Sequence, residues 1–473
     1  MRHARSGSKP RFRYPLPRDG TTRSSAPGSP RSSRALTAAS PTGLARILRR
    51  SPTSTRAKAG RSSFTRPLRR ETLCGVKLGI DRLLAETELR DRLRGRRVGL
   101  LGHPASVTRT LSHSLDALVA SGLDVACAFG PQHGMRGEKQ DNMIESADYV
   151  DPVHGIPVWS LYGETRRPTD EMLDGVDVVL VDLQDLGCRI YTFVTTLRYM
   201  LEAAARCRKS VWVLDRPNPV GRPIEGLRLR PGWESFVGAG PLPMRHGLTL
   251  GELARWFTAS CAIDVHLEVV AMEGWSPDAA PGFGWPLGEL SWVNPSPNAP
   301  SLSMARCYPG TVLIEGTELS EGRGTTRPLE VIGAPGLDPK TILAEMESLA
   351  PEWLRGVRLR ACFFEPTFQK HARVLCGGVQ LHVDHPGYDH EAFRPFRVVA
   401  LLLKAYRRLH PEAPLWRQFE YEYERDRLAI DLLAGGTELR EWVDDPSARP
   451  GDLEALLASD EASWERERAP HLL

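Results

Sequence analysis

The chain has 473 residues, 41% of them hydrophobic and 25% charged, which is the composition of a globular protein with two or three domains. It has no run of eighteen or more apolar residues, which excludes a transmembrane helix and gives no reason to expect a membrane partner. The net charge of +4 hides a split, because residues 1–70 hold 18 Lys and Arg against one acidic residue, and the rest holds 44 basic and 57 acidic residues. This acidic remainder is not expected to bind nucleic acid.

Residues 1–72 are rich in Arg, Ser, Thr and Pro and lack hydrophobic periodicity, so we expect a disordered basic tail. The tail has no apolar core of the length that a secretory signal needs. A transit peptide, a nucleic-acid tether and an extension without function all stay open for it. The eight cysteines are scattered without a CxxC pair, which favours small core side chains in a reducing compartment and predicts a cytoplasmic protein.

The first predicted domain, residues 76–240, alternates short apolar runs with helical patterns. Strands are predicted at 98–101, 125–129, 157–161, 176–181 and 211–214, and helices at 111–121 and 195–206. Because the runs lack period-2 alternation, we expect a parallel sheet with helices on both faces, which is a Rossmann-like α/β architecture. Such sheets bind ligands at the carboxyl ends of their strands.

The remaining residues, 241–473, are predicted to form a smaller α/β domain. Helices are expected at 250–257, 340–349 and 396–409, and strands at 265–270, 357–364 and 377–383. The stretch 273–310 is rich in Pro, Gly and Trp and is expected to be an ordered loop.

Polar clusters follow the predicted strands, and this coincidence indicates a site at the carboxyl edge of the sheet. They combine carboxylates, arginines and aromatic residues beside glycine-rich turns: His103, His133, Asp182, Asp185, Arg189, Tyr191, Asp215, Arg216, Asn218, Glu315, Glu318, Glu321, Arg323 and Arg327. Carboxylates in a desolvated cleft act as general acid, base or nucleophile, and glycoside hydrolysis uses a pair of them. Arginines suit a substrate carboxylate.

The same clusters have structural interpretations. Asp182 and Asp215 are placed to cap the helices that follow them. Arg216 and Arg323 are equally typical of buried ion pairs. No cofactor or metal is expected, because GxGxxG, a Walker lysine loop, HExxH and Cys/His zinc spacings do not occur.

Nine motifs stand in a fixed order along the chain: 129–137 (FGPQHGMRG), 161–168 (LYGETRRP), 182–192 (DLQDLGCRIYT), 214–219, 244–252, 295–298, 308–310, 315–328 and 376–380. They resemble the exo-β-N-acetylmuramidase, or NamZ-type, peptidoglycan glycosidases of glycoside hydrolase family 171, formerly a domain of unknown function. The resemblance extends from about residue 76 to near the C-terminus.

The resemblance implies a bacterial hydrolase with a Rossmann-like N-terminal domain, a smaller α/β C-terminal domain and a cleft between them. It implies removal of terminal β-1,4-linked N-acetylmuramic acid from the non-reducing end of peptidoglycan fragments. This activity would suit cell-wall recycling, and it implies no cofactor. The expected partner is therefore a muropeptide or amino-sugar disaccharide. Its expected binding residues are His103, Arg136, Arg189, Tyr191, Asp215, Arg216, Asn218, Arg245, His246, Asn298, Glu315 and Arg323.

One position departs from the family. The common form of the second loop is Gly-Pro-Glu-His-Gly, whose Glu is the favoured catalytic acid, whereas this chain has Gln132, an amide that cannot donate a proton as a carboxylic acid does. The nearest replacements are Glu138, Asp141 and Glu145, of which we prefer Glu138. The expected catalytic set is Glu138, Gln132, His133, Asp182, Asp185 and Glu321.

The sequence thus favours an exo-acting, muramidase-like glycosidase. The loss of the loop carboxylate keeps two alternatives open. One is a glycosidase of altered specificity, and the other is a non-catalytic muropeptide-binding protein.

Overall fold

The computed structural model describes residues 75–137 and 145–473. The predicted tail over 1–72 and the acidic candidates Glu138 and Asp141 lie outside the described residues. The described residues belong to one compact unit, and the division of the chain into domains at residue 240 stays a prediction. None of the helices in the described part of the chain is both long and apolar enough to cross a membrane.

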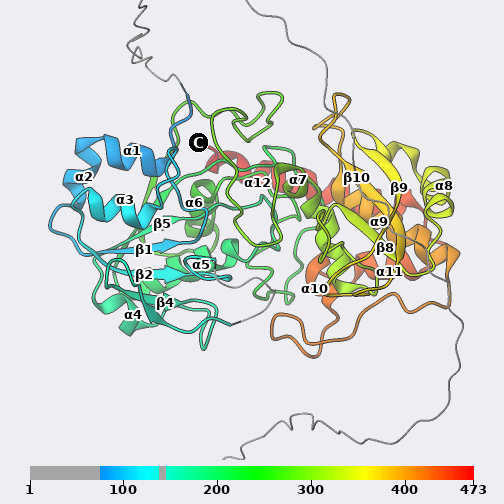
Figure 1. Ribbon diagram of the computed structural model, residues 1–473, viewed down its shortest axis with the longest axis horizontal. Coiled ribbons are helices and arrows are strands. Elements are labelled where there is room, and N and C mark those ends of the chain that lie inside the picture. The colour runs from blue at the N-terminus through cyan, green and yellow to red at the C-terminus, as the bar shows by residue number, and fades with distance from the viewer. Residues whose placement is uncertain (1–74, 138–144) are drawn as a thin grey trace, which may run out of the picture. The chain divides into compact units, whose positions relative to one another are not determined.

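The helices are α1 (Gly79–Ala85), α2 (Thr87–Leu93), α3 (Ser114–Ala120), α4 (Asp170–Asp174), α5 (Phe193–Arg206), α6 (Leu250–Ser260), α7 (Leu302–Thr311), α8 (Pro339–Leu349), α9 (Pro395–Leu409), α10 (Ala429–Ala434), α11 (Glu438–Asp444) and α12 (Pro450–Arg468), with 3-10 turns η1 (Val312–Gly316), η2 (Pro351–Leu354) and η3 (Ala469–His471). The strands are β1 (Val98–Gly102), β2 (Val125–Gly130), β3 (Tyr149–Val150), β4 (Pro157–Ser160), β5 (Val178–Asp182), β6 (Ser210–Leu214), β7 (His266–Val270), β8 (Val331–Ala334), β9 (Arg358–Phe364) and β10 (Cys376–His382). Figure 1 shows their arrangement.

The larger sheet has seven strands in the order β3-β4-β2-β1-β5-β6-β7. All neighbours pair parallel except β3 and β4. The chain winds outward from β1 through β2 and β4, and then crosses to β5, β6 and β7 on the other side. The predicted Rossmann-like α/β fold is confirmed, and its topological switch point lies between the carboxyl ends of β1 and β5.

Both faces of this sheet are covered, as the unbroken apolar runs predict. In β5, Val178 and Leu180 pack into the core on the side of α1, α2 and α3, whereas Val179 and Val181 pack into the core that holds α5 and α6. All four are fully buried. Each such side chain contributes about 1.5–3 kcal/mol relative to exposure, so a strand like β5 cannot lie at a surface.

The second sheet is antiparallel, with the order β8-β10-β9, and α8 packs against β9 and β10. Two expectations from the sequence are wrong here. The strand expected at 265–270 in the second region is β7, which pairs with β6 in the larger sheet. The stretch expected as loop over 273–310 ends in the helix α7. The Ser301 hydroxyl caps the start of this helix, and Pro309 and Gly310 lie within it.

Candidate active site

A hydrogen bond joins two loops at the carboxyl edge of the larger sheet. Gln132 follows β2, and Thr192 precedes α5. The Thr192 hydroxyl donates to Oε1 of Gln132 at 2.8 Å. This bond turns the amide nitrogen of Gln132 away from Thr192, and that nitrogen donates to Oε1 of Glu422 at 3.3 Å.

Glu422 lies at the tip of a tight hairpin formed by residues 421–424. Tyr421 and Glu424 exchange two backbone hydrogen bonds of 3.0 and 2.9 Å. The two residues between them, Glu422 and Tyr423, have φ of 46° and 72°. Such left-handed conformations cost about 1–2 kcal/mol per non-glycine residue and occur disproportionately at functional sites. The turn holds Glu422 against the loop after β2.

These segments line a pocket that is partly open to solvent, with about 440 Å³ of empty space including its open part. Its lining is Gln132, His133, Leu186, Ile190, Tyr191, Thr192, Val237, Ser296, Asn298, Met304, Tyr308, Glu315, Arg323, Leu329, Tyr421 and Glu422. The lining thus combines two carboxylates, one arginine, amides and tyrosine rings with an apolar wall, which are the elements of a small-molecule site.

Glu422 is an unusual carboxyl because no cation pairs directly with it in the described residues. It is buried, and its second oxygen accepts a hydrogen bond of 2.9 Å from the Tyr162 hydroxyl. Burial, and then the negative charge of Glu315, raise the pKa of Glu422 to about 7, although the bonds from Tyr162 and Gln132 act in the opposite direction. A carboxyl with that pKa is protonated in part of the molecules near neutral pH.

The second pocket carboxylate, Glu315, has the opposite environment. It accepts hydrogen bonds from the Arg323 guanidinium at 2.6 Å and from the Tyr421 hydroxyl at 2.8 Å. Arg323 also lies 3.3 Å from Glu321, whose other oxygen is 2.8 Å from the Lys370 ammonium. The positive charges of Lys370 and Arg323 lower the pKa of Glu321 against the effect of burial.

Six residues expected from the sequence therefore line one pocket: Gln132, His133, Tyr191, Asn298, Glu315 and Arg323. Glu321 lies behind them, joined through Arg323. His133, which has a φ of 73°, lines the pocket from the loop after β2. The pocket places a carboxyl with a raised pKa and a carboxylate held by an arginine along the same wall, which is the division of roles that acid–base chemistry requires.

A second group of expected residues is tied together at the switch point. The Asp182 carboxylate accepts from the Arg216 guanidinium at 2.5 and 2.9 Å and from the Ser114 hydroxyl at 2.5 Å. His103 is completely buried, and its Nε2 accepts from the Gln184 amide while Nδ1 faces the Pro295 carbonyl. Burial lowers the pKa of His103 well below its ordinary value, so the ring is neutral. These contacts brace the loops after β1 and β5.

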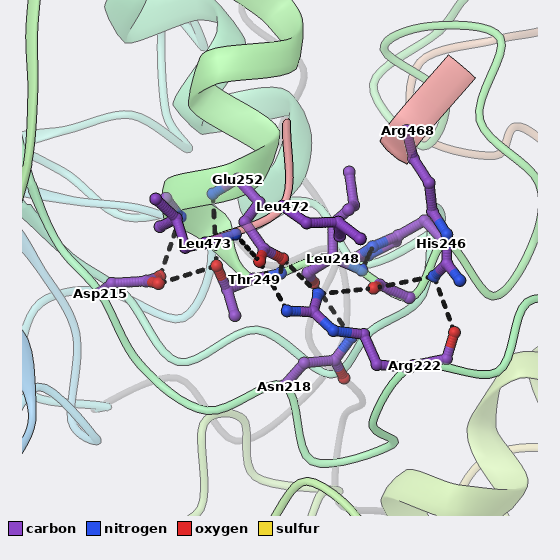
Figure 2. Close-up of polar contacts among 12 residues, drawn as sticks. Asp215, Asn218, Arg222, His246, Leu248, Thr249, Glu252, Arg468, Leu472 and Leu473 are labelled. Carbon is purple, nitrogen blue, oxygen red and sulfur yellow. Dashed lines mark hydrogen bonds and ion pairs between the residues drawn. The ribbon is translucent and has the colours of Figure 1, made fainter. Parts of the chain in front are cut away.

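Asp215, Asn218 and His246 belong to a third network, which Figure 2 shows. Asp215 accepts from the Thr249 hydroxyl at 2.8 Å and from the Gly251 amide at 2.9 Å at the start of α6, in agreement with the capping interpretation. The Asn218 amide donates to the Leu248 carbonyl, and Leu248 donates to Nδ1 of His246. None of the three lines the pocket.

The remaining expected residues make contacts elsewhere. Arg189 donates to the Leu433 carbonyl at 3.0 Å, and Arg245 contacts the Val220 carbonyl and His390. Asp185 accepts from the Gly187 amide. Arg136 pairs with Asp151 and Asp116. Glu145 is one of the three suggested replacement acids. It accepts a hydrogen bond of 2.8 Å from the hydroxyl of Tyr423, the residue that follows Glu422 in the chain.

Sequence reasoning missed Glu422, Tyr162, Thr192 and Lys370 as members of this site. Glu422 lies in Phe419-Glu-Tyr-Glu-Tyr-Glu-Arg, which resembles a charged surface segment. The regular alternation of Tyr and Glu is the available signal, because such alternation predicts an extended segment with two chemically different faces. For metals, residues 75–137 and 145–473 contain no group of three or more His, Cys, Asp or Glu side chains arranged to hold an ion.

Comparison with known proteins identifies the family of the chain. Family models described as exo-beta-N-acetylmuramidase NamZ, N-terminal and C-terminal, match residues 98–303 and 306–473. The chain is 42% identical to the peptidoglycan beta-N-acetylmuramidase NamZ of Bacillus subtilis (strain 168) over 339 residues, covering 71% of this chain and 78% of that protein.

Two crystal structures have the same fold. Both are DUF1343 family proteins from Bacteroides fragilis NCTC 9343. The first has a TM-score of 0.72 at 29% identity and the second 0.63 at 25%, and each comparison covers 84% of this chain and 98% of the other.

The fold and the pocket thus define an α/β protein with a carboxylate-lined site at the edge of a doubly wound sheet. The chain belongs to the exo-β-N-acetylmuramidase NamZ family of glycoside hydrolases. This membership confirms the resemblance inferred from the sequence motifs.

Proposed function

We propose that the protein is an exo-acting glycoside hydrolase that releases terminal N-acetylmuramic acid from the non-reducing end of peptidoglycan fragments. The observation that carries the proposal is the pocket of about 440 Å³ with Glu315 and Glu422 in its lining. Hydrolysis of a glycosidic bond needs two such carboxyl groups with different protonation states, and the pocket supplies two different environments. The name of the Bacillus subtilis relative supports the same sugar.

The division of labour within the pocket follows from its contacts. Glu315, held by Arg323 and Tyr421, is placed to face the positive charge that develops at the anomeric carbon. Tyr191 and Tyr308 present rings at right angles to each other, 6.1 Å apart, and can pack against a sugar. Asn298 offers an amide to hydroxyl or acetamido groups.

We propose a cytoplasmic location on separate grounds. The seven described cysteines are all free thiols, and five of them are buried in the core: Cys127, Cys188, Cys307, Cys362 and Cys376. Such usage is typical of a reducing compartment. Recycling of cell-wall fragments inside the cell fits that location.

The test is incubation of the full chain with N-acetylmuramyl-β-1,4-N-acetylglucosamine and detection of the two free sugars by mass spectrometry. The proposal expects both sugars in equal amounts. Binding of the disaccharide without cleavage would support the alternative of a muropeptide-binding protein, for which the loss of the loop carboxylate at Gln132 is the motivating observation. Cleavage of an aryl glycoside of a sugar other than N-acetylmuramic acid, without cleavage of this disaccharide, would support altered specificity.

A further inference from the structure

The position that the family gives to a carboxylate is held here by an amide, yet the pocket still contains a carboxyl at almost the same place. Nε2 of Gln132 lies 3.3 Å from Oε1 of Glu422, so the two side-chain ends are in direct contact. A carboxyl on either residue therefore reaches the same part of the pocket. The two residues are 290 positions apart in the chain, and only the fold brings them together.

The contacts of Glu422 are those expected of a general acid, which holds a proton and donates it to the substrate. A general acid needs a buried carboxyl with access to the substrate and no cation that fixes it as the carboxylate. Glu422 lines the pocket and has neutral hydrogen-bond partners, Gln132 and Tyr162. The positive charge that acts on it is Arg166, whose guanidinium stacks on the Tyr423 ring at 3.2 Å and pairs with Glu145.

Among residues 75–137 and 145–473, the other carboxylates at or near the site do not meet this requirement. Glu315 is bound to Arg323, and Glu321 is bound to Lys370 and Arg323. Asp182 is bound to Arg216 at the switch point, away from the pocket lining. Glu145 lies beyond the tip of the hairpin, where it accepts from Tyr423 and is more than half exposed.

We propose that Glu422 is the general acid of the reaction and replaces the loop carboxylate that Gln132 lacks. This assignment rests on the proposed glycosidase function. The proton of Glu422 passes to the glycosidic oxygen as the bond from that oxygen to the anomeric carbon breaks, and the electron pair of the bond stays on the departing oxygen. A water molecule supplies the hydroxyl at the anomeric carbon, and its remaining proton restores protonated Glu422 through the solvent.

Gln132 then acts as a positioning residue. Thr192 holds its Oε1, and its Nε2 in turn holds one oxygen of Glu422. The raised pKa of Glu422, about 7, agrees with an acid that is protonated at working pH. The left-handed backbone at Glu422 and Tyr423 fixes the direction of the side chain at the hairpin tip.

The experiment compares two substrates that differ in their need for an acid. N-acetylmuramyl-β-1,4-N-acetylglucosamine has a poor leaving group that must be protonated, whereas the 2,4-dinitrophenyl β-glycoside of N-acetylmuramic acid has a leaving group that departs as an anion. For Glu422→Gln we expect kcat/KM on the disaccharide to fall about 10²–10⁴-fold, and on the dinitrophenyl glycoside less than about tenfold, because only the first needs the proton.

Two further variants sharpen the result. The double variant Gln132→Glu with Glu422→Gln returns a carboxyl to the family position and should recover at least about tenfold of the lost disaccharide activity. Glu420→Gln is the matched control. Glu420 lies two residues before Glu422, just outside the hairpin, does not line the pocket and pairs with Arg425 at the surface, so both rates should stay unchanged.

The outcomes separate the two claims. Equal losses on both substrates by folded Glu422→Gln, or disaccharide cleavage at the native rate, would overturn the assignment alone. Cleavage of neither substrate by the native chain would overturn the proposed function and the assignment with it. Should Glu422→Gln fail to fold, the native pH profiles decide. If activity declines above about pH 7 with the disaccharide but not with the dinitrophenyl glycoside, the assignment of Glu422 is supported. The same decline with both substrates overturns the assignment.

Discussion

The hydroxyl of Thr192 donates to Oε1 of Gln132 at 2.8 Å, and this bond determines that the amide nitrogen, rather than the oxygen, faces Glu422. Gln132, the residue that departs from the family form, therefore has defined hydrogen-bond partners on both sides. It is oriented from one side and donates to a pocket carboxyl on the other. The position thus holds an amide that donates to a buried carboxyl of the pocket.

Gln132→Glu should shift the pH dependence rather than abolish activity. A second carboxyl within about 3.3 Å of Glu422 means that two like charges meet when both ionise, which raises the pKa of the last proton on the pair. The alkaline limb of kcat/KM should move to higher pH than in the native protein. Gln418→Glu adds the same charge outside the pocket lining and serves as the control, and an unchanged or lower limb in Gln132→Glu would contradict the account.

Tyr162→Phe should move the same limb in the same direction. The Tyr162 hydroxyl donates to Glu422 at 2.9 Å and lowers the pKa of that carboxyl by stabilising its charged form. Without the hydroxyl, the pKa of Glu422 rises above about 7 and the enzyme keeps its acid protonated at higher pH. Tyr199→Phe is the matched control, because its ring also lies beside Phe236 but its hydroxyl has no described bond to Glu422. Equal pH profiles for both variants would refute this role.

Arg323→Met should destabilise the fold far more than an exposed substitution of the same kind. Its guanidinium neutralises Glu315 and Glu321, and all three side chains are buried. Removing one partner of a buried ion pair costs about 3–5 kcal/mol. Arg425→Met breaks only the exposed pair with Glu420 and should cost about 0–1 kcal/mol. Urea unfolding of both variants measures the difference, and similar midpoints would be incompatible with the described network.

Asp215→Asn should change how stability depends on pH. Burial, and then the negative charge of Glu252, raise the pKa of Asp215 to about 7. In the unfolded chain an aspartate has a pKa of about 3.9, so the folded state binds the proton more tightly and stability falls by about 1.4 kcal/mol per unit between about pH 4 and 7. The asparagine variant lacks this component.

The comparison of the two proteins isolates Asp215, because Glu422 contributes its own pH dependence to both of them alike. The free energy of unfolding, measured at several values between pH 4 and 7, should decline less steeply for Asp215→Asn than for the native chain. Parallel curves would show that Asp215 is ionised throughout this range.

Much of the fold could be predicted because its strands are buried on both faces. β5 and β6 are continuous apolar runs, and only a covered parallel sheet accommodates them. The sequence places the strand at 265–270 in the second region because that region is expected to begin near residue 240. β7 pairs with β6 instead, and no local pattern in its residues identifies that partner. The helix α7 was missed because proline and glycine within it suggested a loop.

The site was predicted less completely for a physical reason. Carboxylates at strand ends, such as Asp182 and Asp215, also satisfy buried arginines and backbone amides, and sequence alone does not separate these roles. Glu422 comes to the pocket from a hairpin 290 residues beyond Gln132. Its importance lies in what surrounds it, and that surrounding exists only in the folded chain.

The most direct measurement of the central claim is a time course on the defined tetrasaccharide that alternates N-acetylmuramic acid and N-acetylglucosamine, with the muramic sugar at the non-reducing end. The full chain is incubated with it, and the products are followed by mass spectrometry. The account predicts that free N-acetylmuramic acid and the matching trisaccharide appear first and in equal amounts. Disaccharide as the first product, or an intact tetrasaccharide, would contradict it.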